Sequence, residues 1–284
     1  MQETVLITGC SSGIGRASAL AFLEEGWTVY ATARNPADVQ TLGEAGCEIA
    51  TLDVTDDSDV DRVVDRILDA EGSIDCLVNN AGYGRFGPIE DVPIEDVHEQ
   101  FDVNVYGPHR LARAVLPSMR RERDGTIINV SSVFGRISMP GTGVYAGSKH
   151  ALEAMSDALR NELAEYDVDV VVVEPGSVRT GFSERAGHEI PPDDEPGDSD
   201  RDDVRSGAYE EFYRVFEDTQ LVAGDGPGSV EPEAVATEIL NVASMTRPPA
   251  RVQPGTLPRV AVLARHLPDG MRDAAYDLLR KLSR

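Results

Sequence analysis

Apolar residues along this chain gather in short runs that polar residues do not interrupt. Six of these runs are rich in valine, isoleucine and threonine: TVLIT (4–8), TVYAT (28–32), EIATLDV (48–54), DCLVN (75–79), TIINV (126–130) and VDVVVVE (168–174). Such runs are typical of strands that are buried on both faces of a parallel sheet. A seventh, short strand is predicted at ARVQ (250–253).

The segments between these runs carry apolar residues at helical spacing. They cover residues 14–25, 57–71, 93–119 and 144–165, and a further helix is expected to begin near Glu231. Strands that alternate with helices indicate parallel βαβ units. The sequence therefore predicts an α/β fold, a doubly wound and mostly parallel seven-stranded sheet with helices on both faces. We expect one domain over residues 1–284.

Composition limits the partners of this domain. The 284 residues include 50 acidic and 26 basic side chains, and the formal net charge of -24 would repel nucleic acids and anionic membranes. We therefore expect a small-molecule partner, with no nucleic acid and no membrane. The chain contains no run of about eighteen apolar residues and no basic-then-apolar leader, so we expect no membrane span.

The basic residues and the cysteines indicate an environment. Only two lysines accompany twenty-four arginines, and a lysine-poor, acidic chain is typical of organisms that keep molar salt inside their cells. We expect a halophilic source. Three cysteines, Cys10, Cys47 and Cys76, are odd in number and too widely spaced for a metal knuckle. We therefore predict no disulfide framework, no metal site and a reducing, cytoplasmic location.

A glycine-rich turn, TGCSSGIG (8–15), lies between the first predicted strand and the first predicted helix. Its three glycines would let a pyrophosphate approach the helix N-terminus, where free N–H groups and the helix dipole favour anions. A glycine-rich turn alone is a weak signal. Its place after a strand and before a helix nevertheless predicts a dinucleotide site.

A second group of chemical residues follows the fifth predicted strand. Tyr145 and Lys149 are four residues apart on a predicted helix, which places them on one face. A nearby ammonium would lower the pKa of the phenol by roughly one to three units and make it a usable acid or base. Arginine would not replace this compact ammonium. Ser132 ends the preceding strand, at the edge where α/β proteins bind ligands.

These motifs resemble those of a known family. In chain order they are the three glycines, NNAG (79–82), Asn104 in NVYG, Ser132 in NVSS, YAGSK (145–149) and EPGSVRT (174–180). Their order and spacing are similar to those of the short-chain dehydrogenases/reductases, over residues 4 to about 182. The resemblance implies a Rossmann fold and hydride transfer with a nicotinamide dinucleotide. The C-terminal part looks like the hydroxysteroid and retinol dehydrogenase branch.

The resemblance also implies residue roles. Ser132 would hydrogen-bond the substrate oxygen and Tyr145 would donate or remove its proton. Lys149 would hold the nicotinamide ribose, and Asn104 would anchor a water that passes protons to solvent, unless it only caps a kink. Together, the glycine-rich turn and the resemblance imply a set of cofactor-binding residues: Gly9, Ser11, Ser12, Gly13, Ile14, Gly15, Arg34, Asp53, Val54, Asn80, Ala81, Gly82, Tyr145, Lys149, Pro175, Gly176, Val178 and Thr180.

The end of the second strand, TVYATARNP (28–36), indicates which dinucleotide is bound. An acidic residue about twenty residues after the glycine turn would bind the ribose 2′-hydroxyl of NAD, whereas an arginine accommodates the 2′-phosphate of NADP. Arg34 stands here, and no acid occurs before Asp38. We therefore expect NADP(H), with a further hydrogen bond from Ser12. The alternative is that Arg34 only caps a loop or pairs with a surface acid.

The prediction of the substrate depends on residues 183–230, which follow the carboxyl edge of the sheet and could form a substrate lid. The segment AYEEFYRVFEDTQLV (208–222) has an apolar face that could cover the nicotinamide as a lid, or pack as an ordinary surface helix. A lid predicts a bulky, apolar ketone or secondary alcohol as the substrate.

We therefore expect an NADP(H)-dependent carbonyl reductase or alcohol dehydrogenase that forms a homodimer or homotetramer. Two alternatives stay open. One is a dinucleotide-binding sensor without turnover, and the other is an epimerase or dehydratase on the same fold.

Overall fold

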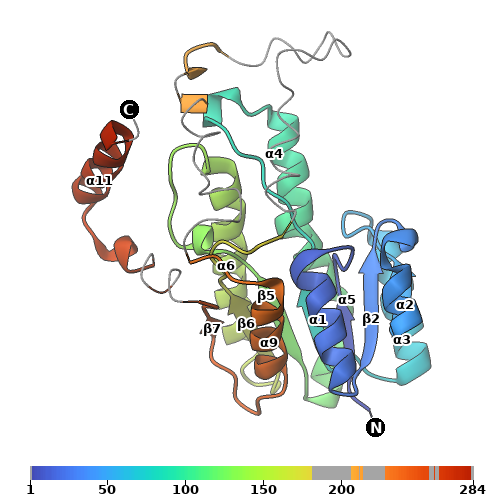
Figure 1. The fold of residues 1–284 in the computed structure, drawn as a ribbon. Coiled ribbons are helices and arrows are strands. Elements are labelled where there is room, and N and C mark those ends of the chain that lie inside the picture. Colours follow the sequence, from blue (N-terminus) through green and yellow to red (C-terminus); the bar gives the residue numbers. More distant parts are fainter. Residues whose placement is uncertain are drawn as a thin grey trace.

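A parallel sheet is the centre of the computed structural model, which describes residues 2–180, 206–210, 212–213, 228–255, 259 and 262–282 (Figure 1). Its strands are β1 (Thr4–Ile7), β2 (Thr28–Ala33), β3 (Glu48–Thr51), β4 (Cys76–Asn79), β5 (Thr126–Val130), β6 (Asp169–Val173) and β7 (Arg251–Val252). In the described residues the order is β3-β2-β1-β4-β5-β6-β7, and all neighbours are parallel. The chain therefore winds outward in both directions from β1, which confirms the predicted fold class.

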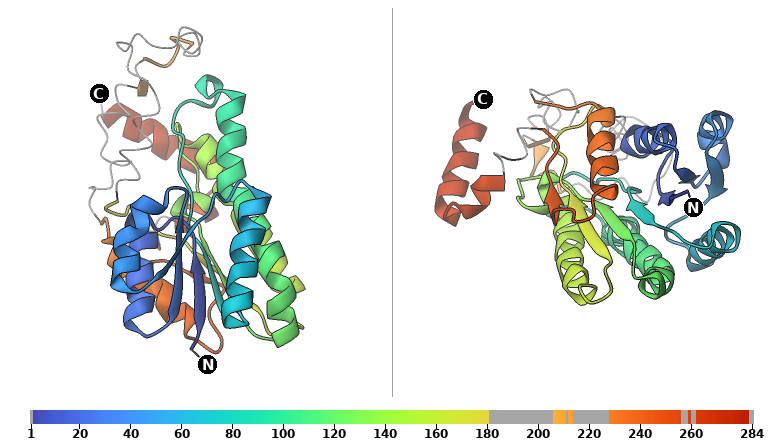
Figure 2. Two further views of the ribbon diagram at one scale, coloured as in Figure 1. Left: turned by 90° about the vertical axis from the view of Figure 1, so that its right-hand side faces the viewer. Right: turned by 90° about the horizontal axis from the view of Figure 1, so that it is seen from below.

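Helices cover both faces of this sheet, as the view from below in Figure 2 shows. One face carries α1 (Gly13–Glu24), α2 (Gln40–Ala45) and α9 (Pro232–Ala243), and the other carries α3 (Asp57–Glu71), α5 (Gly107–Glu122) and α6 (Gly143–Glu162). Each face has its own apolar core. Phe22 and Ile239 belong to the first core, and Ile67 and Leu111 to the second.

Local sequence explains where the predicted helices begin and end. At the start of α3, the Asp56 carboxylate accepts hydrogen bonds from the backbone N–H groups of Ser58 (2.8 Å) and Asp59 (3.3 Å). Gly72 ends the same helix in the left-handed conformation, with φ 87°. The apolar stripe between these caps faces the sheet and is buried. The prediction of a helix over 57–71 is therefore confirmed at both ends.

The predicted helix over 93–119 is instead three segments. They are α4 (Ile94–Phe101), a π-helical turn η3 (Asp102–Tyr106) and α5. Pro108 near the start of α5 has no N–H to offer to the preceding turn, which favours a change in helical register here. The turn is the place where Asn104 lies, so the sequence pattern located this region correctly but missed its break.

A helical stretch after β2 was missed by the sequence pattern. It consists of the 3-10 turn η1 (Pro36–Val39) and α2. The Asn35 side chain accepts a hydrogen bond from the backbone N–H of Ala37 (3.2 Å), and a proline follows at the first helical position. The Asn-Pro pair was therefore a usable start signal, although the stretch is too short for a clear apolar period.

The C-terminal part confirms a helix near Glu231, which is α9, and a short last strand, which is β7. After η5 (Ala264–His266), the helix α11 (Asp269–Leu282) stands away from the sheet, next to the β7 edge (Figures 1 and 2). No helix in the described ranges combines the length and the apolar character that a bilayer crossing needs.

Most of the predicted lid segment, 183–230, lies outside the described residues, so the lid stays a prediction. Two of its tyrosines are described, and both bond to the 3-10 turn η2 (Ile89–Asp91). The Tyr209 hydroxyl donates to Glu90 (2.8 Å), and the Tyr213 hydroxyl donates to Asp91 (3.1 Å).

Candidate active site

The glycine-rich turn after β1 has a backbone that only glycine adopts easily. Gly9 and Gly13 have φ angles of 71° and 56°. A Cβ added to Gly13 would lie 2.9 Å from Cγ2 of Thr180, and one added to Gly15 would lie 2.4 Å from the Gly9 carbonyl oxygen. Ser12 is the N-cap residue of α1. The turn therefore brings backbone N–H groups of a helix N-terminus to an open edge, which is the geometry that binds a pyrophosphate.

The loop after β4 is bonded to this turn, so two motifs that are seventy residues apart form one structure. The Thr8 hydroxyl oxygen accepts hydrogen bonds from the backbone N–H groups of Asn80 (3.1 Å) and Ala81 (3.0 Å). The Asn80 amide donates in return to the carbonyl oxygens of Thr8 (2.9 Å) and Gly9 (3.1 Å). Sequence analysis did not single out Thr8, although it is the first residue of the TGCSSGIG motif.

Ser132, Tyr145 and Lys149 lie together at the carboxyl edge of β5 and are 7%, 6% and 5% exposed. Ser132 caps the 3-10 turn η4 (Val133–Gly135), and its hydroxyl oxygen accepts from the backbone N–H of Phe134 (3.2 Å). The hydroxyls of Ser132 and Tyr145 are hydrogen-bonded to each other. The Lys149 ammonium lies 5.9 Å from the Tyr145 ring centroid and donates to the Val130 carbonyl oxygen (2.9 Å).

Burial changes the titration of both ionisable groups here. Burial raises the pKa of Tyr145 to about 12, although its hydrogen bond to Ser132 partly offsets this. Burial also lowers the pKa of Lys149 to about 8, and the negative charge of Glu153 opposes that change. The expected lowering of the tyrosine pKa was therefore wrong for this structure, because the loss of solvent outweighs the effect of the hydrogen bond to Ser132. At neutral pH the phenol holds its proton and the lysine is charged.

Asn104 connects this pair to the loop after β4. Its side-chain oxygen accepts from the backbone N–H of Tyr83 (3.1 Å), and its amide nitrogen donates to the Tyr83 carbonyl oxygen (2.8 Å) and to the Ser148 hydroxyl (3.1 Å). Ser148 in turn donates to the carbonyl oxygen of Tyr145 (2.8 Å). A Cβ on Gly82 would lie 3.0 Å from the Asn104 side-chain oxygen. Ser148 was not predicted as a site residue, since nothing in the sequence around it marks it as a bridge between Asn104 and Tyr145.

The residues expected at the adenosine end lie beyond β2 and β3. Arg34 is exposed just after β2, and its side chain makes no ion pair with any residue that the structure describes. Asp53 is fixed by hydrogen bonds from the Thr55 backbone N–H (2.9 Å) and hydroxyl (2.7 Å), and Val54 is buried. Arg34 is thus free to meet a phosphate, whereas the Asp53 carboxylate is partly occupied.

The segment after β6 connects the two halves of the site. The Pro175 carbonyl oxygen accepts from the Val133 backbone N–H (2.8 Å), next to Ser132, while Thr180 reaches Gly13 at the other end. Gly176 lies between them, and Val178 forms a β-bridge with Val230. The predicted cofactor residues therefore border one continuous edge of the sheet. Ser11 and Ile14 belong to the glycine turn.

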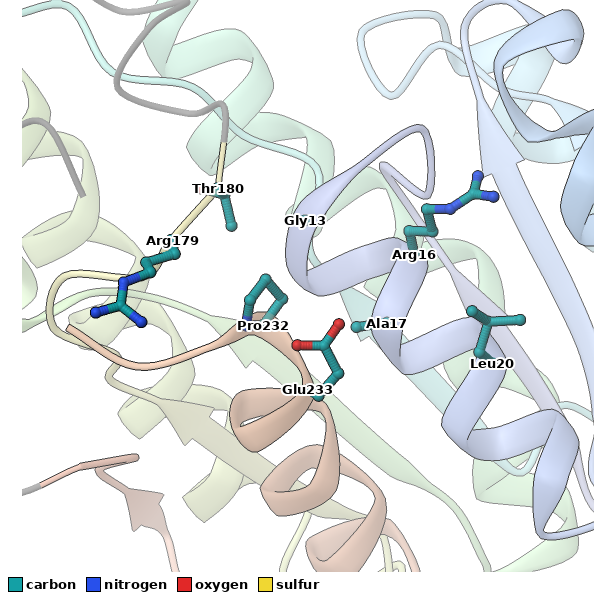
Figure 3. Close-up of a pocket in the computed structure, with 8 residues that line it drawn as sticks. All are labelled: Gly13, Arg16, Ala17, Leu20, Arg179, Thr180, Pro232 and Glu233. Atoms are coloured by element: carbon teal, nitrogen blue, oxygen red, sulfur yellow. The ribbon is translucent and has the colours of Figure 1, made fainter. Parts of the chain in front are cut away.

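A groove of about 280 Å³ lies beside the turn, between α1 and α9 (Figure 3). It is lined by Gly13, Arg16, Ala17, Leu20, Arg179, Thr180, Pro232 and Glu233. None of the residues predicted to be catalytic is among them.

The model of a known family, described as short chain dehydrogenase, matches residues 3–190. The chain belongs to this family. Its relatives in the family include the uncharacterized oxidoreductase YbbO of Escherichia coli K12, which is 42% identical over 65% of this chain and 69% of that protein. The 3-ketodihydrosphingosine reductase of Bacteroides thetaiotaomicron is 32% identical over 96% of both chains. Human retinol dehydrogenase 8 is 36% identical over 88% of this chain and 81% of that protein.

Solved structures of short-chain dehydrogenases have the same fold. One from Streptomyces avermitilis superposes with a TM-score of 0.78 at 32% identity and covers 100% of this chain and 98% of its own. A short-chain dehydrogenase/reductase from Burkholderia phymatum in complex with NAD has a TM-score of 0.75 at 26% identity and covers 93% of both chains. A serine dehydrogenase complexed with NADP+ has a TM-score of 0.74 at 26% identity, over 89% of this chain and 95% of that one. The chain is therefore an oxidoreductase of a family that uses both dinucleotides.

Proposed function

We propose that this short-chain dehydrogenase is an NADP(H)-dependent oxidoreductase that interconverts a bulky, apolar ketone and its secondary alcohol. One observation carries the proposal: Ser132, Tyr145 and Lys149 are buried together at the carboxyl edge of β5, with the two hydroxyls hydrogen-bonded to each other. A buried phenol that keeps its proton at neutral pH can donate that proton to a carbonyl oxygen.

The residues present fit a nicotinamide dinucleotide. A side chain at Gly13 would collide with Thr180, and one at Gly15 with Asn80 and Gly9, so only glycine lets the backbone pack this tightly at the N-terminus of α1, where a pyrophosphate would bind. Lys149 is within reach of the same edge and is charged at neutral pH. When bound, the nicotinamide supplies the hydride for ketone reduction or accepts it in alcohol oxidation.

In the direction of reduction, the Ser132 hydroxyl donates a hydrogen bond to the substrate carbonyl oxygen and orients it. The Tyr145 hydroxyl donates its proton to that oxygen as the carbonyl carbon gains the hydride, which leaves a phenolate. The Lys149 ammonium stabilises this phenolate by its charge. In the direction of oxidation, the same phenolate would accept the alcohol proton.

Asn104 supports the return of a proton to Tyr145 by holding the surrounding segments in place. Both ends of its side-chain amide are used by Tyr83 and Ser148. A water at this position would therefore be anchored by the Asn104 backbone carbonyl, in a π-helical turn where the regular helical hydrogen bonds are interrupted.

Arg34 supports NADP(H) over NAD(H). It is exposed past the end of β2, has no ion-pair partner in the described part of the chain, and has no acid beside it before Asp38. Such a side chain can pair with a 2′-phosphate, whereas an acid would repel it. Similar proteins have been solved with NAD and with NADP+, so the preference of this chain is inferred from Arg34.

Aromatic rings beside Tyr145 support an apolar substrate. The ring centroids of Phe86 and Phe134 lie 5.4 Å and 6.0 Å from that of Tyr145. Two relatives are named for retinol and for 3-ketodihydrosphingosine, and both of these are large, mainly apolar alcohol or carbonyl compounds. The predicted lid over 183–230 would add further apolar surface.

The direct test follows NADPH oxidation with a panel of ketones that ranges from small polar compounds to long-chain and polycyclic ones. We expect turnover that rises with apolar size. NADPH binding without turnover on any member would instead favour a regulatory sensor. Conversion of a substrate without net change in NADPH would favour an epimerase, which returns the hydride, or a dehydratase, which does not consume it.

A further inference from the structure

A cluster of buried charges lies directly behind Lys149. Glu153, one turn further along α6, is 5% exposed, and Glu174, just after β6, is fully buried. Arg251 of β7 lies between them, with its Nε atom 3.0 Å from Glu153 and 3.1 Å from Glu174. Arg136, after η4, lies 3.8 Å and 3.6 Å from the same two carboxylates. Four separate segments thus converge on one point behind the candidate active site.

Glu153 is the member of the cluster that lies one helical turn from Lys149, whose ammonium itself donates to the Val130 carbonyl oxygen. A spacing of four residues puts both side chains on one face of α6, and the negative charge of Glu153 opposes the effect of burial on the pKa of Lys149. On its other sides Glu153 meets the Ser131 hydroxyl, Arg136, Arg251 and the like charge of Glu174. Burial and Glu174 raise the pKa of Glu153, and the Ser131 hydroxyl and Arg251 oppose them.

The carboxylates of the cluster are paired with arginines. Asp157, at the partly exposed end of the cluster, pairs with the Arg251 Nη2 atom (2.7 Å) and with Arg160 (2.6 Å). Gln253 donates to the remaining oxygen of Glu174 (2.5 Å). Because a buried charge is tolerated only when it is paired, Arg136 and Arg251 make a charged Glu153 possible.

We propose that Glu153 is a positioning residue for Lys149, and that its carboxylate, held by Arg136 and Arg251, keeps the buried ammonium charged where the Val130 carbonyl oxygen holds it beside Tyr145. The consequence for catalysis rests on the proposed function, whereas the interaction between Glu153 and Lys149 is independent of it. Neutralising Glu153 removes a buried negative charge one helical turn from the ammonium, so Lys149 gives up its proton at lower pH and the phenolate of Tyr145 loses its stabilising charge in the same range.

The scarcity of lysine makes this interaction directly measurable. The chain has two lysines, Lys149 and Lys281, so labelling lysine with carbon-13 at Cε and replacing Lys281→Arg leaves a single NMR resonance. Its chemical shift followed against pH gives the titration midpoint of Lys149 itself. In this background we expect a midpoint near 8. Glu153→Gln should lower it by about one pH unit, the effect of removing a close opposite charge.

Asp157→Asn is the matched control, because it removes a carboxylate bonded to the same arginine but lies two turns from Lys149 on α6. We expect it to move the midpoint by less than about 0.3 units. Equal midpoints in Glu153→Gln and Asp157→Asn would overturn the proposal. Should Glu153→Gln not fold, Glu153→Asp, whose carboxylate is one methylene further from the ammonium, decides: a lowered midpoint supports the proposal and an unchanged one overturns it.

Enzyme kinetics then connect the interaction to turnover. The alkaline limb of the kcat profile should move to lower pH in Glu153→Gln by the same amount as the NMR midpoint, and stay in place in Asp157→Asn. A limb that does not follow the midpoint would overturn the role beside Tyr145. If the wild type shows no NADPH-dependent turnover at all, the proposed function fails, while the NMR titration still decides whether Glu153 holds the charge of Lys149.

Discussion

The glycine turn after β1 and the Ser132–Tyr145–Lys149 group share one edge of the sheet but are built by opposite means. The turn relies on backbone: its glycines exclude side chains, and its bonds to the Asn80 loop involve main-chain groups. The second group relies on buried side chains whose titration is shifted by burial. The glycine turn depends on the space around its backbone, whereas the Ser132–Tyr145–Lys149 group depends on the charge of its side chains. Different substitutions should therefore damage each of them.

Tyr145→Phe should cause the largest loss. Removing the hydroxyl leaves ring packing against Phe86 in place but removes the proton donor, so we expect kcat to fall at least about a hundredfold with an unchanged Kd for NADPH. Steady-state kinetics with the best ketone and a fluorescence titration with NADPH measure the two effects. Tyr166→Phe, at a partly exposed tyrosine beside Arg120, is the control and should change neither. Turnover that survives in Tyr145→Phe would refute the assigned role.

Gly15→Ala should do the opposite and weaken binding. Its Cβ would lie 2.4 Å from both the Asn80 amide nitrogen and the Gly9 carbonyl oxygen, so the turn and its partner loop must shift. We expect the Kd for NADPH to rise about tenfold or more and the free energy of unfolding to fall by about 1–3 kcal/mol, as measured by urea denaturation. Gly43→Ala, a helical glycine whose Cβ would meet only Ile49 at 3.4 Å, should leave NADPH binding unchanged. An unaffected Kd in Gly15→Ala would show that the turn does not bind the dinucleotide.

Arg34→Asp tests a charge within the otherwise backbone-based half of the site. Replacing a phosphate partner by a repelling carboxylate should lower the kcat/KM ratio of NADPH to NADH by about tenfold, which corresponds to roughly 1.4 kcal/mol. Initial rates with the two cofactors give this ratio. Arg120→Asp makes the same charge change on α5 and should leave the ratio unaltered. A wild type that prefers NADH would show that the end of β2 does not select the phosphate.

The smallest expected change is one of stability: Lys149→Met removes an ammonium that turnover needs, but it should make the fold more stable. The pKa of Lys149 is lowered from 10.5 to about 8, so the unfolded chain binds the proton more tightly than the folded one between these pH values. The cost of the buried charge is therefore fully present below about pH 8 and declines as the pH rises towards 10.5. We expect Lys149→Met to raise the free energy of unfolding at pH 7 by about 1 kcal/mol. Denaturation at pH 7 and pH 10 should show a larger gain at pH 7, and the reverse order would contradict the assigned burial cost.

The sheet was predictable from sequence because its central strands are buried on both faces and are rich in β-branched and other apolar residues. The seventh strand had a weaker signal, because β7 is only two half-buried residues long and one of them is Arg251. The break at η3 was not predictable, since apolar spacing looks alike on both sides of a π turn. The short α2 was missed because six residues give too little period.

For the candidate site, the sequence predicted that Ser132, Tyr145 and Lys149 lie together, as they do in the structure, but not how burial changes their titration. Spacing placed Tyr145 and Lys149 on one face, but the direction of the tyrosine pKa change depends on burial, which spacing does not reveal. The ion pairs of Glu153 were out of reach for a related reason. Its partners Arg136, Glu174 and Arg251 come from separate segments, and in a chain with 50 acidic residues a single glutamate carries little information.

The π-helical turn η3 makes chain length a constraint on the site. A π turn holds about one residue more than an α turn. Deleting one residue from 102–106 would leave only enough chain for a regular α turn, so α4 and α5 would keep about the same relative orientation while the backbone between them changes. The bonds of the Asn104 side chain to Tyr83 and Ser148 depend on that backbone. A single deletion here should therefore disturb the site while leaving the two helices in place.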